Sequence, residues 1–242
     1  RTMAAYGRPM EVQTKDDQSP VTATDRAVEE LIRRQLEDER VGDAVVGEEL
    51  GRLGFGRRTW IVDPIDGTAN FIRGIPVWAT LLALDVVGVV EVGVVSAPAL
   101  GRRWWAARGR GALAGPPGGP GEALSVSDVR SLGEAQLSYP GTHDWDGHGG
   151  AERLVELAAL CKRDRGFGDF WSHCLVAEGA CDIALDPVVS LWDLAALQVI
   201  VEEAGGRFTD LAGVARADGG SAISSNGHLH EAALAVLRGA GG

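Results

Sequence analysis

Two aspartates three residues apart carry the clearest chemistry in this sequence. Asp63 and Asp66 lie in the segment 63–68, read DPIDGT, directly after an apolar run that ends at Val62. A proline and a glycine stiffen this turn and allow a tight backbone exit. Mg²⁺ prefers oxygen ligands and keeps several waters, so two carboxylates and a carbonyl such as that of Ile65 can hold it. An aspartate pair alone is often a plain turn, but the whole segment predicts a divalent-metal site.

Further acidic residues could complete this site, although each has a structural alternative. Glu48 and Glu49 are adjacent and follow two valines, a pattern that is also typical of a solvated loop. Asp193 stands at the expected start of an apolar helix, where an aspartate is commonly a cap. The residue types alone leave open whether these carboxylates bind metal.

The first half of the chain predicts a helix and a largely antiparallel sheet. Asp25 falls in the first turn of that helix, where a negative charge suits the helix dipole. The expected elements are a helix over 22–39, a strand over 58–62, a hairpin over 78–97 that turns at 87–88, and strands over 102–107 and 111–113. The tandem tryptophans at 104–105 are expected to pack in the core or an interface.

The second half alternates helices and strands, which is typical of an α/β unit. The expected helices cover 151–161, part of 168–179, 191–204 and 228–237, and the strands cover 207–211 and 222–224. The glycine- and proline-rich segment 115–121 is either a surface loop or the junction between lobes. We expect one compact unit with an N-terminal α+β lobe (1–120) and a C-terminal α/β lobe (121–242).

Composition narrows the possible partners. The 242 residues carry a formal net charge of −11, so nucleic acid and anionic lipid are not expected to bind. No apolar run reaches the about 20 residues that a membrane span needs. Cys174 and Cys181 lie in an apolar run and, with Cys161, form no CxxC pair, which predicts buried thiols in a reduced, cytoplasmic setting. The chain opens with Arg1 rather than Met, so we expect a trimmed start.

Taken in order, three motifs resemble the inositol monophosphatase family: Gly47-Glu48-Glu49, the segment 63–68, and Trp192-Asp193. The resemblance runs from about Lys15, a family lysine near the metal site, to the C-terminus. It implies a mixed α+β / α/β fold, the layered αβαβα sandwich of the sugar phosphatases. It also implies a homodimer, lithium sensitivity and two to three Mg²⁺ per subunit.

The same resemblance assigns roles to residues. Glu48, Asp63, Asp66 and Asp193 would bind metal with the Ile65 carbonyl, and Glu48 would also position a third ion. Thr68, with Asp25 behind it, would orient the attacking water. Asp66 and the amides of Gly67 and Thr68 would contact the phosphate.

Substrate choice depends on a second group of residues, where the chain resembles the histidinol-phosphate phosphatases of this family. Gly168, Asp169 and Trp171 fall in that stretch, and Asp186 matches a family acid that contacts the leaving group. Asp169 could pair with the substrate ammonium and Trp171 could face its ring, although a helix cap and core packing are the alternatives. The expected activity is histidinol phosphate hydrolysis in histidine biosynthesis. Hydrolysis of inositol 1-phosphate or another sugar phosphate, and an inactive metal-binding protein, remain alternatives.

Overall fold

A large antiparallel sheet forms one half of the molecule. The computed structural model describes residues 1–15, 19–142, 145 and 151–239. Within them the first sheet has eight strands in the order β10-β9-β8-β7-β6-β5-β3-β4, and only β3 and β5 pair in parallel. Its strands are β3 (Ala44–Gly47), β4 (Gly51–Leu53), β5 (Arg58–Asp66), β6 (Ala79–Val86), β7 (Val89–Ala97), β8 (Arg102–Ala107), β9 (Ala112–Gly115) and β10 (Glu122–Ala123). The predicted hairpin and its turn at 87–88 are confirmed.

A smaller mixed sheet forms the other half. Its five described strands follow the order β12-β11-β13-β15-β14, and β11 pairs in parallel with both of its neighbours. The bounds are β11 (Gln136–Ser138), β12 (Arg163–Arg165), β13 (Ile183–Asp186), β14 (Arg207–Thr209) and β15 (Ala222–Ser225). A separate hairpin of β1 (Val12–Thr14) and β2 (Pro20–Thr22) follows the short helix α1 (Thr2–Ala5).

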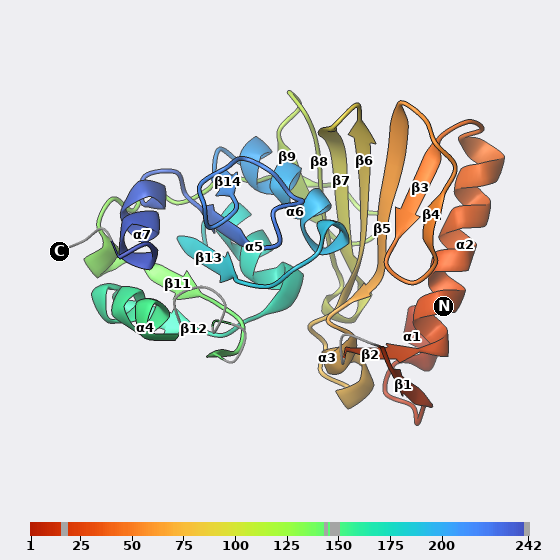
Figure 1. Cartoon of the computed structure of the whole chain (residues 1–242), viewed down its shortest axis with the longest axis horizontal. Coiled ribbons are helices and arrows are strands. Elements are labelled where there is room, and N and C mark those ends of the chain that lie inside the picture. Colours follow the sequence, from red (N-terminus) through yellow and green to blue (C-terminus); the bar gives the residue numbers. More distant parts are fainter. Residues whose placement is uncertain (16–18, 143–144, 146–150, 240–242) are drawn as a thin grey trace.

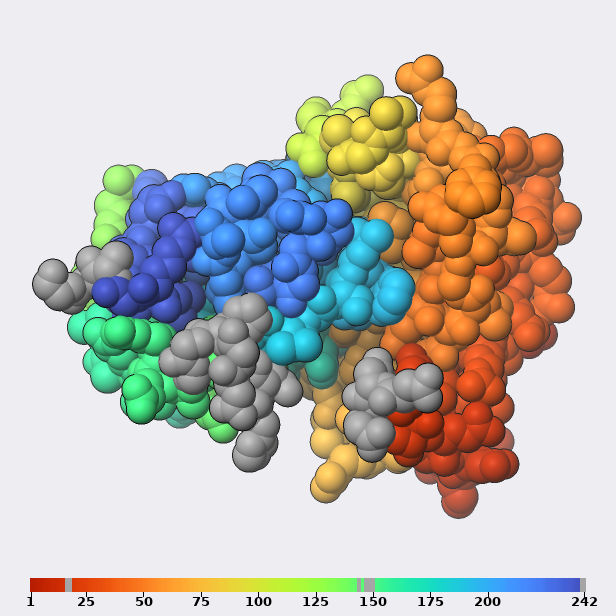
Figure 2. All heavy atoms as spheres, viewed as in Figure 1, coloured from red at the N-terminus to blue at the C-terminus, as the bar shows by residue number. Residues whose placement is uncertain are grey.

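Helices cover these sheets in alternating layers, as Figure 1 shows. Helix α2 (Ala23–Glu39) covers the outer face of the first sheet, and α5 (Asp169–Ala177) and α6 (Leu191–Glu203) lie between the two sheets. Helices α4 (Ala151–Leu160) and α7 (His230–Leu237) cover the far side of the second sheet. The expected αβαβα sandwich is therefore confirmed, and the space-filling view shows its two halves side by side (Figure 2).

Helix α6 is the central element of the sandwich. Residues 194–201 are all buried and all but Gln198 are apolar, which fits a helix that is surrounded by other elements. A Cβ at Gly93 of β7 would come within 2.5 Å of the Ala196 carbonyl oxygen, so the helix backbone lies directly on the strand. The helix ends before Gly205, whose φ of 87° only glycine adopts readily, as the sequence predicts.

Two further expectations concern buried residues and the chain's division. Cys174, Cys181 and Trp104 are fully buried, whereas Trp105 is half-buried. The loop over 115–121 connects β9 to β10, which pair with each other, so it is a surface loop within the first sheet. The division at 120/121 stays a prediction. None of the described helices is both long and apolar enough to cross a membrane.

Candidate functional site

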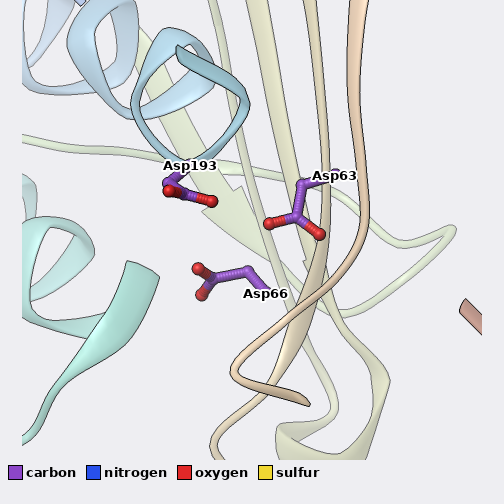
Figure 3. Close-up of side chains that lie close together, drawn as sticks. All are labelled: Asp63, Asp66 and Asp193. Atoms are coloured by element: carbon purple, nitrogen blue, oxygen red, sulfur yellow. The ribbon is translucent and has the colours of Figure 1, made fainter. Parts of the chain in front are cut away.

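Three carboxylates from two distant parts of the chain meet between the first sheet and α6. One oxygen each of Asp63, Asp66 and Asp193 lies within 4.8 Å of the other two. Figure 3 shows the three side chains pointing toward one shared space, two from the end of β5 and one from the start of α6. The predicted metal motif and Asp193 are therefore brought together.

An irregularity in β5 explains how both motif aspartates reach the same side. Residues three apart in a regular strand point to opposite faces of the sheet. Asp63 pairs with Leu81 and Asp66 with Ala79, and the register shifts between the two pairs. Such a bulge re-aims the side chains that follow it. The strand thus extends through Asp66, beyond the predicted end at 62.

Each of the three carboxylates is oriented by a backbone amide. Asp63 accepts from the amide of Ile65 at 2.9 Å, and Asp66 accepts from the amide of Phe170 at 2.9 Å. Asp193 accepts from the amide of Ser190 at 2.7 Å, in a capping box at the start of α6. Asp193 is therefore the N3 residue of a capping box whose N-cap is Ser190, and it also belongs to the acidic cluster, so the structural and the metal-binding readings of this residue are compatible.

The electrostatics of the cluster favour a bound cation. Burial, together with the neighbouring carboxylates, raises the pKa of Asp63 and of Asp66 well above its ordinary value. Burial also raises the pKa of Asp193 to about 6. Buried carboxylates that repel one another are stabilised by protons or by a cation. The all-oxygen set fits a hard divalent ion, which Asp63, Asp66 and Asp193 would hold.

Glu48 lies beside this cluster but outside the group of three. It forms an ion pair with Lys15 at 2.7 Å, and Lys15 also pairs with Glu49 at 2.5 Å. Burial lowers the pKa of Lys15, but its bonds to the two glutamates outweigh burial and raise the pKa above the ordinary value. Burial raises the pKa of Glu48 to about 7, with a contribution from the charge of Asp193. Metal binding by Glu48 stays a prediction.

A buried residue of α2 holds the turn that carries these glutamates through hydrogen bonds to its backbone. Glu29 accepts hydrogen bonds from the amides of Glu49 (2.7 Å) and Leu50 (3.2 Å), and pairs with Arg33 at 2.7 Å. A Cβ at Gly47 would overlap the Glu29 carboxylate, so only glycine fits there. Sequence reasoning missed this role of Glu29, because the two amides that it holds lie about 20 residues away in the sequence.

Thr68 and Asp25 meet as the sequence predicts. The Thr68 hydroxyl lies 2.8 Å from the Ile65 carbonyl oxygen and 3.3 Å from Asp25 Oδ1. Asp25 is fully buried and also accepts from the Thr22 amide at 2.8 Å, which fixes its orientation at the start of α2. The predicted metal-ligand carbonyl and the predicted water-orienting pair therefore form one connected group.

Asp169 faces the metal motif from the start of α5. The helix cap is Gly168, so the alternative in which Asp169 is the N-cap is wrong. Asp169 has a φ of 48°, a left-handed conformation that is uncommon outside glycine and is most often found in Asn and Asp. Asp169 Oδ2 lies 3.2 Å from where a Cβ of Gly67 would be, and it accepts a hydrogen bond from Asn70 at 2.7 Å.

Asp169 and Asp186 share a pocket of about 230 Å³ with Asp66 and Asp193. The pocket is also lined by the apolar side chains of Pro140, Phe170, Val188, Val189, Leu194 and Leu197. Burial, with the charges of Asp186 and Asp193, raises the pKa of Asp169 to about 7. Trp171 is not among the lining residues, and its ring packs edge-on against Phe167 at 5.4 Å. In this structure Trp171 thus packs against other side chains, as the core-packing alternative predicts.

Comparisons with known proteins find relatives over almost the whole chain. The model of the Inositol monophosphatase family matches residues 2–241. The histidinol-phosphatase of Mycobacterium tuberculosis is 56% identical over 94% of this chain and 88% of its own length. The histidinol-phosphatase of Streptomyces coelicolor is 46% identical over 94% and 87%. A solved IMPase structure from Thermotoga maritima superimposes with a TM-score of 0.88 at 33% identity, covering 98% of this chain and 91% of that one.

Proposed function

The chain belongs to the inositol monophosphatase family and is a phosphoric monoester hydrolase, and from this we propose that it hydrolyses L-histidinol phosphate to L-histidinol and phosphate. One observation carries the choice of substrate: Asp169 and Asp186 line the same pocket as two of the proposed metal ligands. A phosphate ester at the metals would therefore place its leaving group beside two carboxylates. Histidinol phosphate carries an ammonium and an imidazole, whereas inositol phosphate carries only hydroxyls on its leaving group.

We propose that two to three Mg²⁺ bind at this site. Asp63, Asp66 and Asp193 would hold them, joined by Glu48 and the Ile65 carbonyl. When bound, such ions supply Lewis-acid chemistry that activates water and stabilises charge on the leaving oxygen. None of the ligands needs to act as a separate general base.

The protein's own groups would orient the reactants. The Thr68 hydroxyl can donate its proton to the Ile65 carbonyl at 2.8 Å or to Asp25 at 3.3 Å, which leaves its lone pairs free to accept from a water. We propose that this is the water that attacks phosphorus, and that Thr68 orients it. The amides of Gly67 and Thr68 stand at the start of helix α3 (Thr68–Arg73), where an anionic phosphate is favoured.

The pocket walls would select the leaving group. Asp169 lies next to the turn at Gly67, so its carboxylate can pair with an ammonium attached near the ester oxygen. Val188 and Val189 offer apolar contact for the carbon skeleton. We propose ammonium recognition by Asp169 and Asp186. Gly168 caps the start of α5 with φ 77° and ψ 167°, a conformation that is essentially restricted to glycine.

A comparison of two substrates tests the assignment. Rates are measured with Mg²⁺ on histidinol phosphate and on inositol 1-phosphate, and kcat/KM is expected to be higher for histidinol phosphate by at least about 100-fold, since charged hydrogen bonds are worth about 1.5–3 kcal/mol each. A preference for inositol 1-phosphate would overturn the substrate. Absence of Mg²⁺-dependent phosphate release from any ester would overturn the hydrolytic role itself.

Three broader features belong to the same proposal. We propose that the enzyme acts in histidine biosynthesis, because two of its relatives are histidinol-phosphatases. We also propose, on the family resemblance alone, that it acts in the cytoplasm and as a homodimer. The mass of the protein in solution tests the dimer. The pathway is tested by expressing the protein in a strain that lacks its own histidinol-phosphatase and measuring whether that strain then grows without added histidine.

A further inference from the structure

A buried histidine lies behind one wall of the substrate pocket. His173 on α5 is fully buried, and both ring nitrogens have partners. Nε2 lies 2.6 Å from Asp186 Oδ2, and Nδ1 lies 2.6 Å from Ser224 Oγ. The ring therefore bridges a pocket carboxylate and a strand of the second sheet.

The register of the second sheet explains this alignment. Ser224 on β15 pairs with Ala184 on β13, and Asp186 follows Ala184 by two positions on the same strand. Residues opposite each other, and residues two apart, project from the same face of a sheet. Ser224 and Asp186 thus both face α5, where His173 spans them. The ring cannot turn without losing both hydrogen bonds.

The histidine fixes one oxygen of Asp186 and leaves the other for the pocket. In the described part of the chain no other group bonds the Asp186 carboxylate. Asp186 shares its pocket with the acidic residues Asp66, Asp169 and Asp193, whose charges repel it. A carboxylate in such a field needs an anchor to stay turned toward a ligand.

We propose that His173 is a positioning residue for the ammonium subsite, holding Asp186 toward the substrate through the chain Ser224–His173–Asp186. The inference rests on the proposed function, because it assumes a cationic leaving group. His173 does not touch the substrate, and it acts by keeping one carboxylate oxygen in place. Its loss should therefore weaken binding of a cationic ester more than turnover of a neutral one.

The chain offers a matched control. His230 is also fully buried, and its ring nitrogens lie 2.9 Å from Thr209 Oγ1 and 2.9 Å from Ser225 Oγ. It has two hydroxyl partners and no carboxylate of the pocket. His230→Asn should thus show how much activity is lost simply because a buried histidine with two hydrogen bonds is replaced by a shorter side chain.

The test compares His173→Asn, His173→Gln and His230→Asn in the presence of Mg²⁺. Asparagine is too short to reach Asp186, whereas the glutamine amide can donate to it. For His173→Asn we expect KM for histidinol phosphate to rise about 10- to 100-fold, the range for a hydrogen bond to a charged group, and kcat for p-nitrophenyl phosphate to change less than threefold. His173→Gln should recover most of the affinity, and His230→Asn should leave KM unchanged.

Several results would overturn the proposal. One is that His173→Asn lowers activity on histidinol phosphate and on p-nitrophenyl phosphate by the same factor. Another is that its KM for histidinol phosphate is no higher than that of His230→Asn. A third is that His173→Asn raises KM as much in an Asp186→Asn background as in the wild type, where a residue acting through Asp186 should add nothing. Should His173→Asn not fold, His173→Gln decides, because it keeps a donor to Asp186: a KM for histidinol phosphate near the wild-type value supports the proposal, and a KM raised as far as in Asp186→Asn overturns it. Failure of the proposed function looks different, because the wild type would then hydrolyse p-nitrophenyl phosphate without preferring histidinol phosphate to inositol 1-phosphate.

Discussion

The side-chain amide of Asn70 donates a hydrogen bond of 2.7 Å to Asp169, although the two residues are 99 positions apart. The same amide donates to the Val77 carbonyl at 2.9 Å, so Asn70 is itself fixed. Asn70 lies on α3 directly after the metal motif, and Asp169 starts α5. This contact joins the helix that follows the metal motif to the residue that we propose binds the substrate ammonium.

The charge of Asp169 can be tested without disturbing its backbone. Asparagine tolerates the left-handed conformation at φ 48°, so Asp169→Asn should keep the fold. We expect kcat/KM for histidinol phosphate to fall about 10- to 100-fold, because an ion-paired hydrogen bond is lost. The rate on p-nitrophenyl phosphate should change little. Asp128→Asn, at an exposed aspartate, is the control, and equal losses on both substrates would refute the role.

Removing one carboxylate of the cluster should separate activity from stability. Asp66→Asn is expected to lower kcat/KM at least about 100-fold, because mutating even a residue that only hydrogen-bonds a metal ligand typically lowers metal affinity or activity 10- to 100-fold. Without metal the variant should melt higher than the wild type, because burial and neighbouring acids raise the Asp66 pKa and disfavour its charged form. Melting curves with and without Mg²⁺ check this. Near-normal turnover would rule out Asp66 as a ligand.

The stability of the metal-free protein should depend on pH in a defined window. Burial raises the pKa of Glu48 and of Asp169 to about 7 and that of Asp193 to about 6, whereas unfolded carboxyls titrate near 4. Between these values the folded state binds more protons than the unfolded state, so stability should fall as pH rises from about 4 to about 7. Above pH 7 no further loss is expected from these groups.

Mg²⁺ should reverse that loss, because it takes the place of the protons. The rise in Tm on adding Mg²⁺ should be larger at pH 8 than at pH 6, and calorimetry at pH 6.5 in two buffers should record proton release on binding. A Mg²⁺ effect that is independent of pH would contradict the proposed ligand set.

The turn below Glu48 should tolerate no side chain at Gly47. A methyl group there overlaps the Glu29 carboxylate, which Arg33 and two amides hold in place. Gly47→Ala is therefore expected to lower the free energy of unfolding by about 1–3 kcal/mol, the usual cost of overpacking. Activity should fall as well, because Glu48 is displaced. Gly141→Ala, where a methyl group meets nothing within 4 Å, should be neutral in both measurements.

The sequence predicts local features of the site well and its long-range contacts poorly. The segment 63–68, Asp193 and the Thr68–Asp25 pair were predictable because each has a recognisable motif or helix start. The bulge between Asp63 and Asp66 was not, because it depends on how β5 pairs with β6. His173 looks like one more residue of an apolar helix until the second sheet supplies its partners.

The bounds of helices and strands show the same contrast between local signals, which the sequence reveals, and long-range contacts, which it does not. Helix α2 begins at Ala23 after its Thr22 cap, as the predicted helix over 22–39 requires. The strand ending at 62 was too short, because residues of the metal motif continue the ladder with β6. Hydrophobic periodicity therefore locates elements, whereas tertiary pairing decides where strands end.

Helix α6 packs against both sheets, and this limits how the protein can diverge. A substitution in its middle must fit against both neighbouring sheets at once, so few amino acids are tolerated there. The position of Asp193 at the start of the helix is therefore preserved. The pocket rim is under no such constraint, since Val188 is 65% exposed. After gene duplication, a copy can therefore acquire a new substrate through rim changes while inheriting the hydrolytic centre intact.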